Sequence, residues 1–254
     1  MRALKSLVKR MLPRPVLAYL QAMDHYLRGE PEIRLIPQLA ARGRDAIDAG
    51  ANIGTYTFFL RRHARRVYAF EPNPQLADKL RALFPNVEVR NLALSDRAGQ
   101  VVLRIPIHPD GTELHELASI AQSFDWQTRD CPIRSVTIDS ENFDNIGFVK
   151  VDVEQHERQV LQGAMETIKR CRPTIMTEIS PLKYEQPLPE VFAFLTRHAY
   201  FGWFRFGGRW LPLADYRSEL HCNRVHYGSK DKFIGGNILF FPDEHALSRT
   251  GPAA

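Results

Sequence analysis

The chain alternates between short apolar runs and longer stretches in which apolar residues recur at helical spacing. Stretches of the second kind occupy 55–63, 75–83 and 157–169. The short runs have the near-continuous hydrophobicity of strands that are buried on both faces. Five such runs lie at 45–49, 67–70, 87–94, 146–153 and 174–179. This order predicts an α/β fold: a doubly wound, mostly parallel sheet, with helices on both faces and its ligand at the carboxyl ends of the strands.

Residues 95–145 interrupt this alternation. Strand-like pieces at 100–107 and 132–138 flank a polar loop near 108–130, and no long helical period occurs. We expect an insertion with short antiparallel strands, which lies over the carboxyl edge of the sheet and shapes a substrate pocket.

The end of the chain has a pattern of its own. A predicted helix at 189–198 precedes two aromatic strands at 200–206 and 237–241. Residues 246–254 are rich in Pro and Ala at their end and are expected to be a frayed tail. We place the main domain at 30–245.

Residues 1–29 form a basic, amphipathic extension before that domain. Five Lys and Arg residues fall within residues 1–14, and no acid occurs before Asp24. Apolar residues recur between them at helical spacing, so this segment is either a helix on an anionic lipid surface or a helix packed on the domain. We favour packing, with weak membrane-surface contact through 1–14 as the alternative.

The net charge of +5 belongs to this extension, since the remainder of the chain is near neutral. Basic residues are therefore not spread around the predicted ligand edge, and we expect no nucleic-acid partner. An RNA-binding or RNA-modifying protein stays the alternative from a different functional class. The pattern gives no prediction of oligomeric state.

The cysteines indicate a reducing compartment. Cys131, Cys171 and Cys222 are widely spaced and odd in number, which fits neither a disulfide framework nor a zinc cluster. Lysines interrupt the apolar core that a signal peptide would need, and no run reaches the roughly twenty apolar residues of a membrane span. We expect a cytoplasmic protein, peripheral to the inner membrane face if the N-terminal helix binds lipid.

The segment AIDAGANIGTYTF at 46–58 reads as strand, tight turn and helix. Gly50 and Gly54 allow a sharp turn, but Thr55 follows without the Lys of a P-loop, and Asn52 stands where a dinucleotide fingerprint needs Gly. A helix N-terminus favours an anion, whereas Asp48 before the turn favours an amino group. The amino-acid end of S-adenosylmethionine carries both charges, so the turn predicts this cofactor.

Two further strand ends carry suitable groups. Glu71 ends the second strand, where a carboxylate accepts the hydroxyls of a ribose. Ser95 and Asp96 follow the third strand, where an acid can accept a hydrogen of the adenine amino group. Three successive strands with such endings predict ligand binding far better than one.

The segments DAGANIGTYT, AFEP, NLALSDRAG, FVKVDVEQHERQVLQGA and RPTIMTEI resemble the FkbM family of S-adenosylmethionine-dependent methyltransferases, over roughly residues 30–245. The resemblance implies a Rossmann-like class I fold, with seven strands and a final antiparallel hairpin, and an O-methylation activity. It also implies that Gly50, Asn52 and Gly54 line the cofactor, with Glu71 on its ribose and Asp96 near its adenine. One departure is that Gln155, followed by His156, stands where the family has Gly, so the turn there is expected to differ in shape.

The candidate catalytic groups lie on the fourth strand and after it. In FVKVDVE, Lys150, Asp152 and Glu154 share one face. We assign Lys150 a structural role and Asp152 a place in the site, and we leave Glu154 open between the two. Glu178, at the end of the fifth strand, is a further candidate. His156 is a possible general base by its ordinary pKa, although a solvated surface position is the favoured interpretation.

We predict no metal site, because no compact ligand cluster is visible, although Asp152 could hold a divalent ion. The expected reaction is methyl transfer to a hydroxyl of a small polar acceptor. A sugar of a glycan or glycolipid is preferred, by family association alone, over a polyketide or another secondary metabolite.

Overall fold

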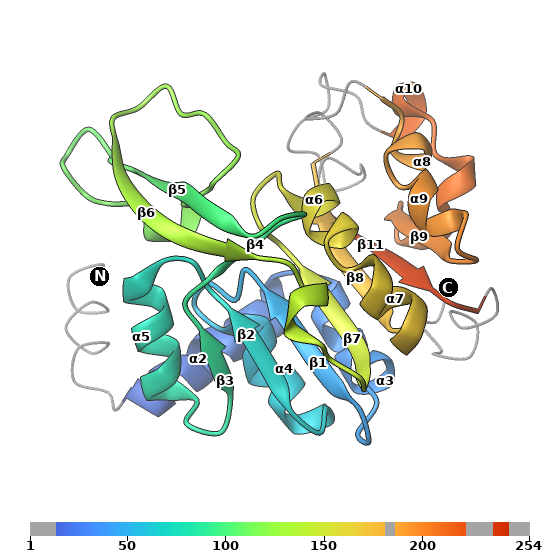
Figure 1. Cartoon of the computed structure of the whole chain (residues 1–254), viewed down its shortest axis with the longest axis horizontal. Helices are drawn as coiled ribbons and strands as arrows, with labels where there is room; N and C mark the ends of the chain where they lie inside the picture. Colours follow the sequence, from blue (N-terminus) through green and yellow to red (C-terminus); the bar gives the residue numbers. More distant parts are fainter. Residues whose placement is uncertain (1–13, 181–185, 222–235, 244–254) are drawn as a thin grey trace.

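The computed structural model describes residues 14–180, 186–221 and 236–243 (Figure 1). Its main sheet has eight strands in the order β10-β9-β11-β8-β7-β1-β2-β3. Their bounds are β1 (Asp45–Ala49), β2 (Val67–Phe70), β3 (Glu88–Arg90), β7 (Ile146–Val151), β8 (Thr174–Ile179), β9 (Phe201–Phe206), β10 (Arg209–Pro212) and β11 (Gly236–Phe241).

The strand directions match the predicted fold class. The five strands from β3 to β8 are mutually parallel, and β11 lies antiparallel between β8 and β9. The doubly wound, mostly parallel sheet of the class I methyltransferase fold is therefore confirmed. The sheet has one strand more than the expected seven, because β10 pairs antiparallel with the outer side of β9.

Helices cover both faces of the sheet, and the apolar residues of β1 are buried on both faces. Ile47 and Ala49 pack into one cluster with α6 and α7, whereas Ala46 packs into the other with α3 and α4. The helices of the two layers and their connections are α2 (Arg14–Arg28), η1 (Pro31–Leu35), α3 (Ile36–Leu39), α4 (Thr55–His63), α5 (Pro74–Leu83), η3 (Asp139–Glu141), α6 (Glu157–Gln162), α7 (Met165–Cys171), α8 (Leu188–Val191), α9 (Ala193–Thr196), η5 (Leu213–Asp215) and α10 (Ser218–His221).

The run 87–94 is not the single strand that its hydrophobicity predicts. It divides into β3, at the edge of the main sheet, and β4 (Ala93–Leu94), which belongs to a second sheet. Asn91 holds the bend, because its Nδ2 donates to the carbonyls of Glu71 and Pro72 at 2.9 and 2.8 Å. A polar side chain that bonds to a neighbouring loop thus ends the strand.

The helices predicted at 157–169 and 189–198 are each divided in two. The break between α6 and α7 lies at Gly163, where a Cβ would stand 2.1 Å from the carbonyl oxygen of Ser95. This close approach positions the β4 loop against the helical layer. The second helix divides into α8 and α9 at Phe192, which is fully buried.

The insertion forms a separate three-stranded sheet in the order β4-β6-β5 (Figure 1). β5 (Gly99–Pro106) and β6 (Thr128–Val136) make a long antiparallel pair rather than the short strands expected, and η2 (His115–Leu117) lies in the loop between them. This loop reaches the carboxyl edge of the main sheet.

At the N-terminus, α2 packs against α4 and α5. The basic segment 1–13, the tail at 246–254 and Cys222 lie outside the described residues. Of the helices in the described ranges, none is long and apolar enough to cross a membrane.

Gly50→Ala tests how tightly the first turn is packed. Gly50 has φ +78°, and an added Cβ would lie 1.8 Å from the carbonyl oxygen of Asp152. The left-handed backbone should cost about 1–2 kcal/mol, and the clash should add roughly 1–3 kcal/mol. Thermal unfolding should therefore occur about 5 °C lower or more.

Gly111→Ala is the matched control, because Gly111 has φ +86° and nothing within 4 Å of the added Cβ. The free energy of unfolding of this variant should fall only by the cost of the left-handed backbone. Equal unfolding temperatures for the two variants would contradict the packing of Gly50 on the backbone of Asp152.

Candidate functional site

Two adjoining cavities lie at the carboxyl ends of the parallel strands, where the sequence predicts the ligand. The first is lined by Glu71, by apolar residues of β2 and β4, and by the insertion. The second is lined by Asp48, Thr55 and the start of α4. Gly50, Asn52, Glu116 and Asp152 line both, so the cavities adjoin across the turn after β1.

The turn after β1 takes three left-handed residues, with φ of 78° at Gly50, 52° at Asn52 and 87° at Gly54. Gly50 faces the cavities and touches β7. Gly54 faces away from them, since its added Cβ would meet Leu80 and Phe84 of the α5 segment at 2.6 and 2.5 Å. Gly54 thus shapes the turn from behind, and Thr55 begins α4 at the second cavity.

Glu71 is buried at the end of β2 and faces the first cavity. Its carboxylate accepts the backbone N–H of Asn52 at 2.7 Å and that of Asn73 at 2.8 Å. Burial raises the pKa of Glu71 to about 7, although these two N–H donors oppose the rise. The side chain therefore ties the turn after β1 to the turn after β2.

The insertion forms the roof of the first cavity. Asn52 Nδ2 donates to the carbonyl of Glu116 at 3.0 Å, and Asn73 Nδ2 lies 3.0 Å from His115 Nδ1. Because an amide nitrogen only donates, Nδ1 is the acceptor, and the proton of His115 lies on Nε2, which is 3.2 Å from Glu113. Asn52 Oδ1 is buried and has no hydrogen-bond partner among the described residues.

Ser95, Asp96 and His156 form a cluster beside the cavities. The Ser95 hydroxyl donates to Asp96 Oδ1 at 3.0 Å and lies 2.9 Å from His156 Nε2. Asp96 is exposed, and burial lowers the pKa of His156. None of the three lines either cavity, whereas Ala93 and Leu94 just before them line the first.

Asp48 lies at the base of the second cavity and is almost fully buried. Its carboxylate accepts the hydroxyl of Thr57 at 2.5 Å. Burial raises the pKa of Asp48 to about 6, against the effect of this hydrogen bond. A cationic group in the second cavity would stabilise the ionised form of Asp48.

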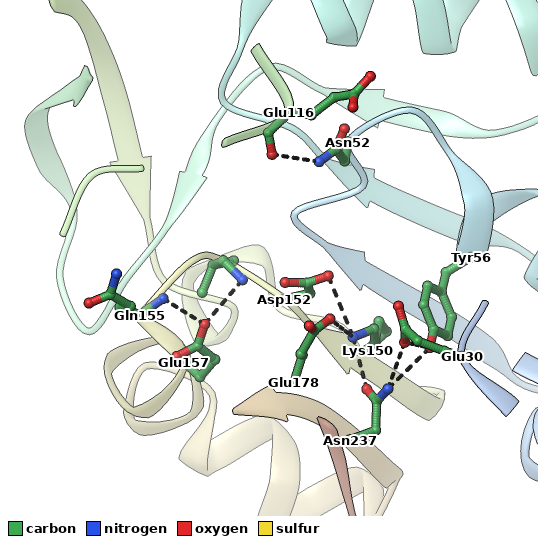
Figure 2. A network of polar contacts seen from close by, with 11 residues as sticks. Glu30, Asn52, Tyr56, Glu116, Lys150, Asp152, Gln155, Glu157, Glu178 and Asn237 are labelled. Atoms are coloured by element: carbon green, nitrogen blue, oxygen red, sulfur yellow. Dashed lines mark hydrogen bonds and ion pairs between the residues drawn. The ribbon is translucent and has the colours of Figure 1, made fainter. Parts of the chain in front are cut away.

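Lys150, on β7, is the centre of a polar network at this end of the sheet (Figure 2). Its side chain is fully buried, and Nζ donates to Asn237 Oδ1 at 3.0 Å. Nζ lies 3.7 Å from carboxylate oxygens of both Asp152 and Glu178 and 4.6 Å from the ring centroid of Tyr56. Burial acts to lower the pKa of Lys150, but the surrounding carboxylates outweigh it, and the pKa is raised.

Both ends of the domain contribute to this network. Asn237 Nδ2, on β11, donates to Glu30 Oε2 at 2.7 Å, and the Tyr56 hydroxyl donates to the same oxygen at 2.5 Å. Sequence reasoning missed all three residues. Of the three, only Asn237 stands out in the sequence, because it is a polar residue in the otherwise apolar strand GNILFF.

Asp152, directly after β7, and Glu178, on β8, lie together beside Lys150 Nζ (Figure 2). Burial raises the pKa of Glu178 to about 8, the negative charge of Asp152 adds to the rise, and Lys150 opposes it. Asp152 also lines both cavities. The carboxylate of Asp152 is therefore placed to accept a proton from a ligand.

The corner after β7 keeps the shape that a glycine would favour. Glu154 and Gln155 have φ of 53° and 77°. Buried Glu157 holds the turn, because its carboxylate accepts the N–H of Gln155 at 2.9 Å and that of Val153 at 3.4 Å (Figure 2). Gln155 therefore adopts the left-handed conformation despite its side chain. Glu154 lines the first cavity, and its carbonyl accepts the hydroxyl of Ser119 at 2.7 Å.

Within the described part of the chain, no group of three or more His, Cys, Asp or Glu side chains is arranged to hold a metal ion.

Comparisons with known proteins agree with this geometry. Hexuronic acid methyltransferase AglP of Haloferax volcanii is 31% identical over 154 residues, which are 56% of this chain and 59% of AglP. The crystal structure of Methyltransferase FkbM from Methylobacillus flagellatus KT has a TM-score of 0.51 at 16% identity and covers 94% of this chain and 58% of that chain. A putative methyltransferase from Streptococcus mutans in complex with SAH has a TM-score of 0.42 at 11% identity, over 83% of this chain and 95% of that chain. This chain thus spans less than two thirds of AglP and of the Methylobacillus protein.

Residues 48–201, more than half of the chain, match the Methyltransferase FkbM domain. The match extends from Asp48, before the first turn, to Phe201, at the start of β9, and includes every predicted site residue. It confirms the resemblance seen in the sequence and the predicted S-adenosylmethionine cofactor. The chain belongs to the FkbM family of S-adenosylmethionine-dependent methyltransferases.

Proposed function

We propose that the protein transfers a methyl group from S-adenosylmethionine to a hydroxyl of a small polar acceptor, a sugar of a glycan or glycolipid. The observation that carries the O-directed reaction is the Asp152–Glu178 pair beside a buried lysine, of which Asp152 lines both cavities. AglP, a hexuronic acid methyltransferase by name, supports a sugar acceptor.

The residues of the two cavities fit the cofactor. Glu71 suits the ribose hydroxyls in the first cavity, where apolar residues such as Phe70 and Leu94 suit the adenine. Asp48 suits the ammonium of the amino-acid end in the second cavity, close to the N–H groups that begin α4. Asn52 Oδ1 is buried at the junction, has no hydrogen-bond partner within the described ranges, and suits a hydrogen bond from the cofactor.

The cofactor supplies an already activated methyl group, so the chain must orient the acceptor hydroxyl and remove its proton. Asp152 is the group that we assign to accept this proton, since it lies at the junction of the cavities. Glu178 and Lys150 hold Asp152 in place and share its charge. Glu154 faces the first cavity and is the next candidate, whereas His156 is held by Ser95 away from both cavities.

Asp152→Asn should lower turnover about 100-fold or more, because a positioned base contributes about 10²–10⁴ to the rate. The measurement is transfer of a labelled methyl group to a panel of sugars, nucleotide sugars and lipid-linked glycans. The affinity for S-adenosylhomocysteine (SAH), measured by calorimetry, should stay within about threefold of the wild-type value, because the base acts on the acceptor. Asp78→Asn, on the exposed face of α5, is the matched control and should keep full turnover. Full turnover in Asp152→Asn would remove Asp152 from the mechanism, and no transfer to any hydroxyl acceptor by the wild type would contradict the proposed function.

Glu71→Gln should weaken SAH binding by about 10-fold to 100-fold, because a hydrogen bond to a charged group contributes about 1.5–3 kcal/mol. Calorimetry of the purified protein measures this without an acceptor. Asp96→Asn is the companion variant and should have a smaller effect, since Asp96 is exposed outside the cavities. A larger loss for Asp96→Asn than for Glu71→Gln would reverse the two assignments.

Turnover should rise with pH through about 8, where Glu178 loses its proton. The sign follows from the raised pKa of Glu178: below it Glu178 is neutral, and above it Glu178 adds a negative charge beside Asp152 that favours proton transfer from the acceptor. Glu178→Gln removes this titrating group, so the rise near pH 8 should disappear. Single-turnover rates at saturating cofactor measure this, with Glu166→Gln on the surface of α7 as the control. A flat wild-type profile from roughly pH 6 to 9 would exclude Glu178 as a partner of the base.

A further inference from the structure

We propose that α2 docks the protein on the surface of an anionic lipid bilayer. The docking stripe consists of the outward apolar side chains of this helix: Val16, Tyr19, Leu20 and Leu27.

These four side chains are 42%, 47%, 48% and 64% exposed. At 3.6 residues per turn they fall within an arc of roughly 100° on one side of the helix. Large apolar residues scattered singly over a surface need no explanation, but a stripe on one helix is typical of an interaction site. The docking stripe therefore places its apolar side chains along one side of α2.

Apart from an edge-to-face contact of Tyr19 with Phe58, α2 contacts the domain through its other faces. Ala22 is 2% exposed, and the ring of Tyr26 lies 5.6 Å from that of Phe59 on α4. His25, on a third side, lines the second cavity. Packing on the domain thus accounts for one face of α2, as favoured for the N-terminal extension. Among the described residues, no helix or strand covers the docking stripe.

Positive charge lies at the border of the docking stripe. Tyr19 meets Phe58 of α4 edge to face at 6.0 Å, and the guanidinium groups of Arg61 and Arg62 lie 5.0 and 4.1 Å from the Phe58 ring centroid. In the sequence, five further Lys and Arg residues occur within residues 1–14, and Asp24 is the first acid. An apolar stripe with cations beside it complements an interface of acyl chains and anionic headgroups.

Charge complementarity favours lipid over the other possible occupants of the stripe. A second copy of this chain would bring the same cations together, and residues 1–13 would add more of them. Anionic headgroups neutralise these charges, while the leucines reach the acyl boundary. This docking concerns the surface of the protein, so it holds whether or not the acceptor is a glycolipid.

The test is co-sedimentation of the full chain with vesicles of phosphatidylcholine alone and with added phosphatidylglycerol. The wild type should bind the anionic vesicles at least about tenfold more tightly than the neutral ones, and high salt should weaken this binding. The double variant Leu20→Glu and Leu27→Glu should lose at least about tenfold in affinity for the anionic vesicles.

Leu220→Glu is the matched control, because Leu220 is 67% exposed on α10, away from the stripe. It should bind vesicles like the wild type. Hydrogen exchange of the wild type adds a measurement that does not depend on the folding of variants, and anionic vesicles should protect the amides of α2.

Three results would overturn the proposal: no binding of the wild type to anionic vesicles, equal binding of the wild type and the double variant, or unchanged exchange in α2. A dimer that the double variant abolishes, together with absent vesicle binding, would assign the stripe to self-association instead.

Discussion

The ammonium group of Lys150 constrains the whole carboxyl edge of the sheet. A charged amine with no solvent exposure is expensive unless it is paired and hydrogen-bonded, and removal of one partner from such a group costs about 3–5 kcal/mol. Its neighbours come from β7, β8, β11 and the loop before η1. The order of strands in the sheet and the path of the N-terminal segment are thus both needed to provide the partners of Lys150 Nζ.

The partners of Lys150 lie at unequal distances from its Nζ, and this difference affects which of them a ligand can use. The short contact of 3.0 Å goes to the neutral amide of Asn237, whereas Asp152 and Glu178 stand at 3.7 Å. Asn237 also donates to Glu30, so the amide links the lysine to a third carboxylate. Lys150 therefore stabilises the charge of the Asp152–Glu178 pair without taking all of the hydrogen-bonding capacity of either oxygen, and the pair stays available to a ligand.

How much the sequence could predict depends on how local each feature is. The turn after β1 is encoded within 46–58, and its strand, turn and helix lie where the pattern places them. The bend at Asn91 depends on carbonyls about twenty residues earlier, so an apolar run alone suggests one strand. The partnership of Glu30 with Asn237 spans 207 positions and exists only once the sheet is assembled. Local patterns therefore predict the cofactor side of the site and miss much of the lysine network.

The corner after β7 shows how a residue with a side chain can hold a backbone conformation that favours glycine. A side chain at φ 77° costs about 1–2 kcal/mol relative to glycine, yet Gln155 keeps this conformation. Glu157 offsets the cost, because its buried carboxylate satisfies two N–H groups of the turn. The same turn sets the direction of Glu154, whose carbonyl holds Ser119 of the insertion. The strained corner thus joins β7 to the roof of the first cavity, so that Asp152 and this cavity are positioned by one short segment.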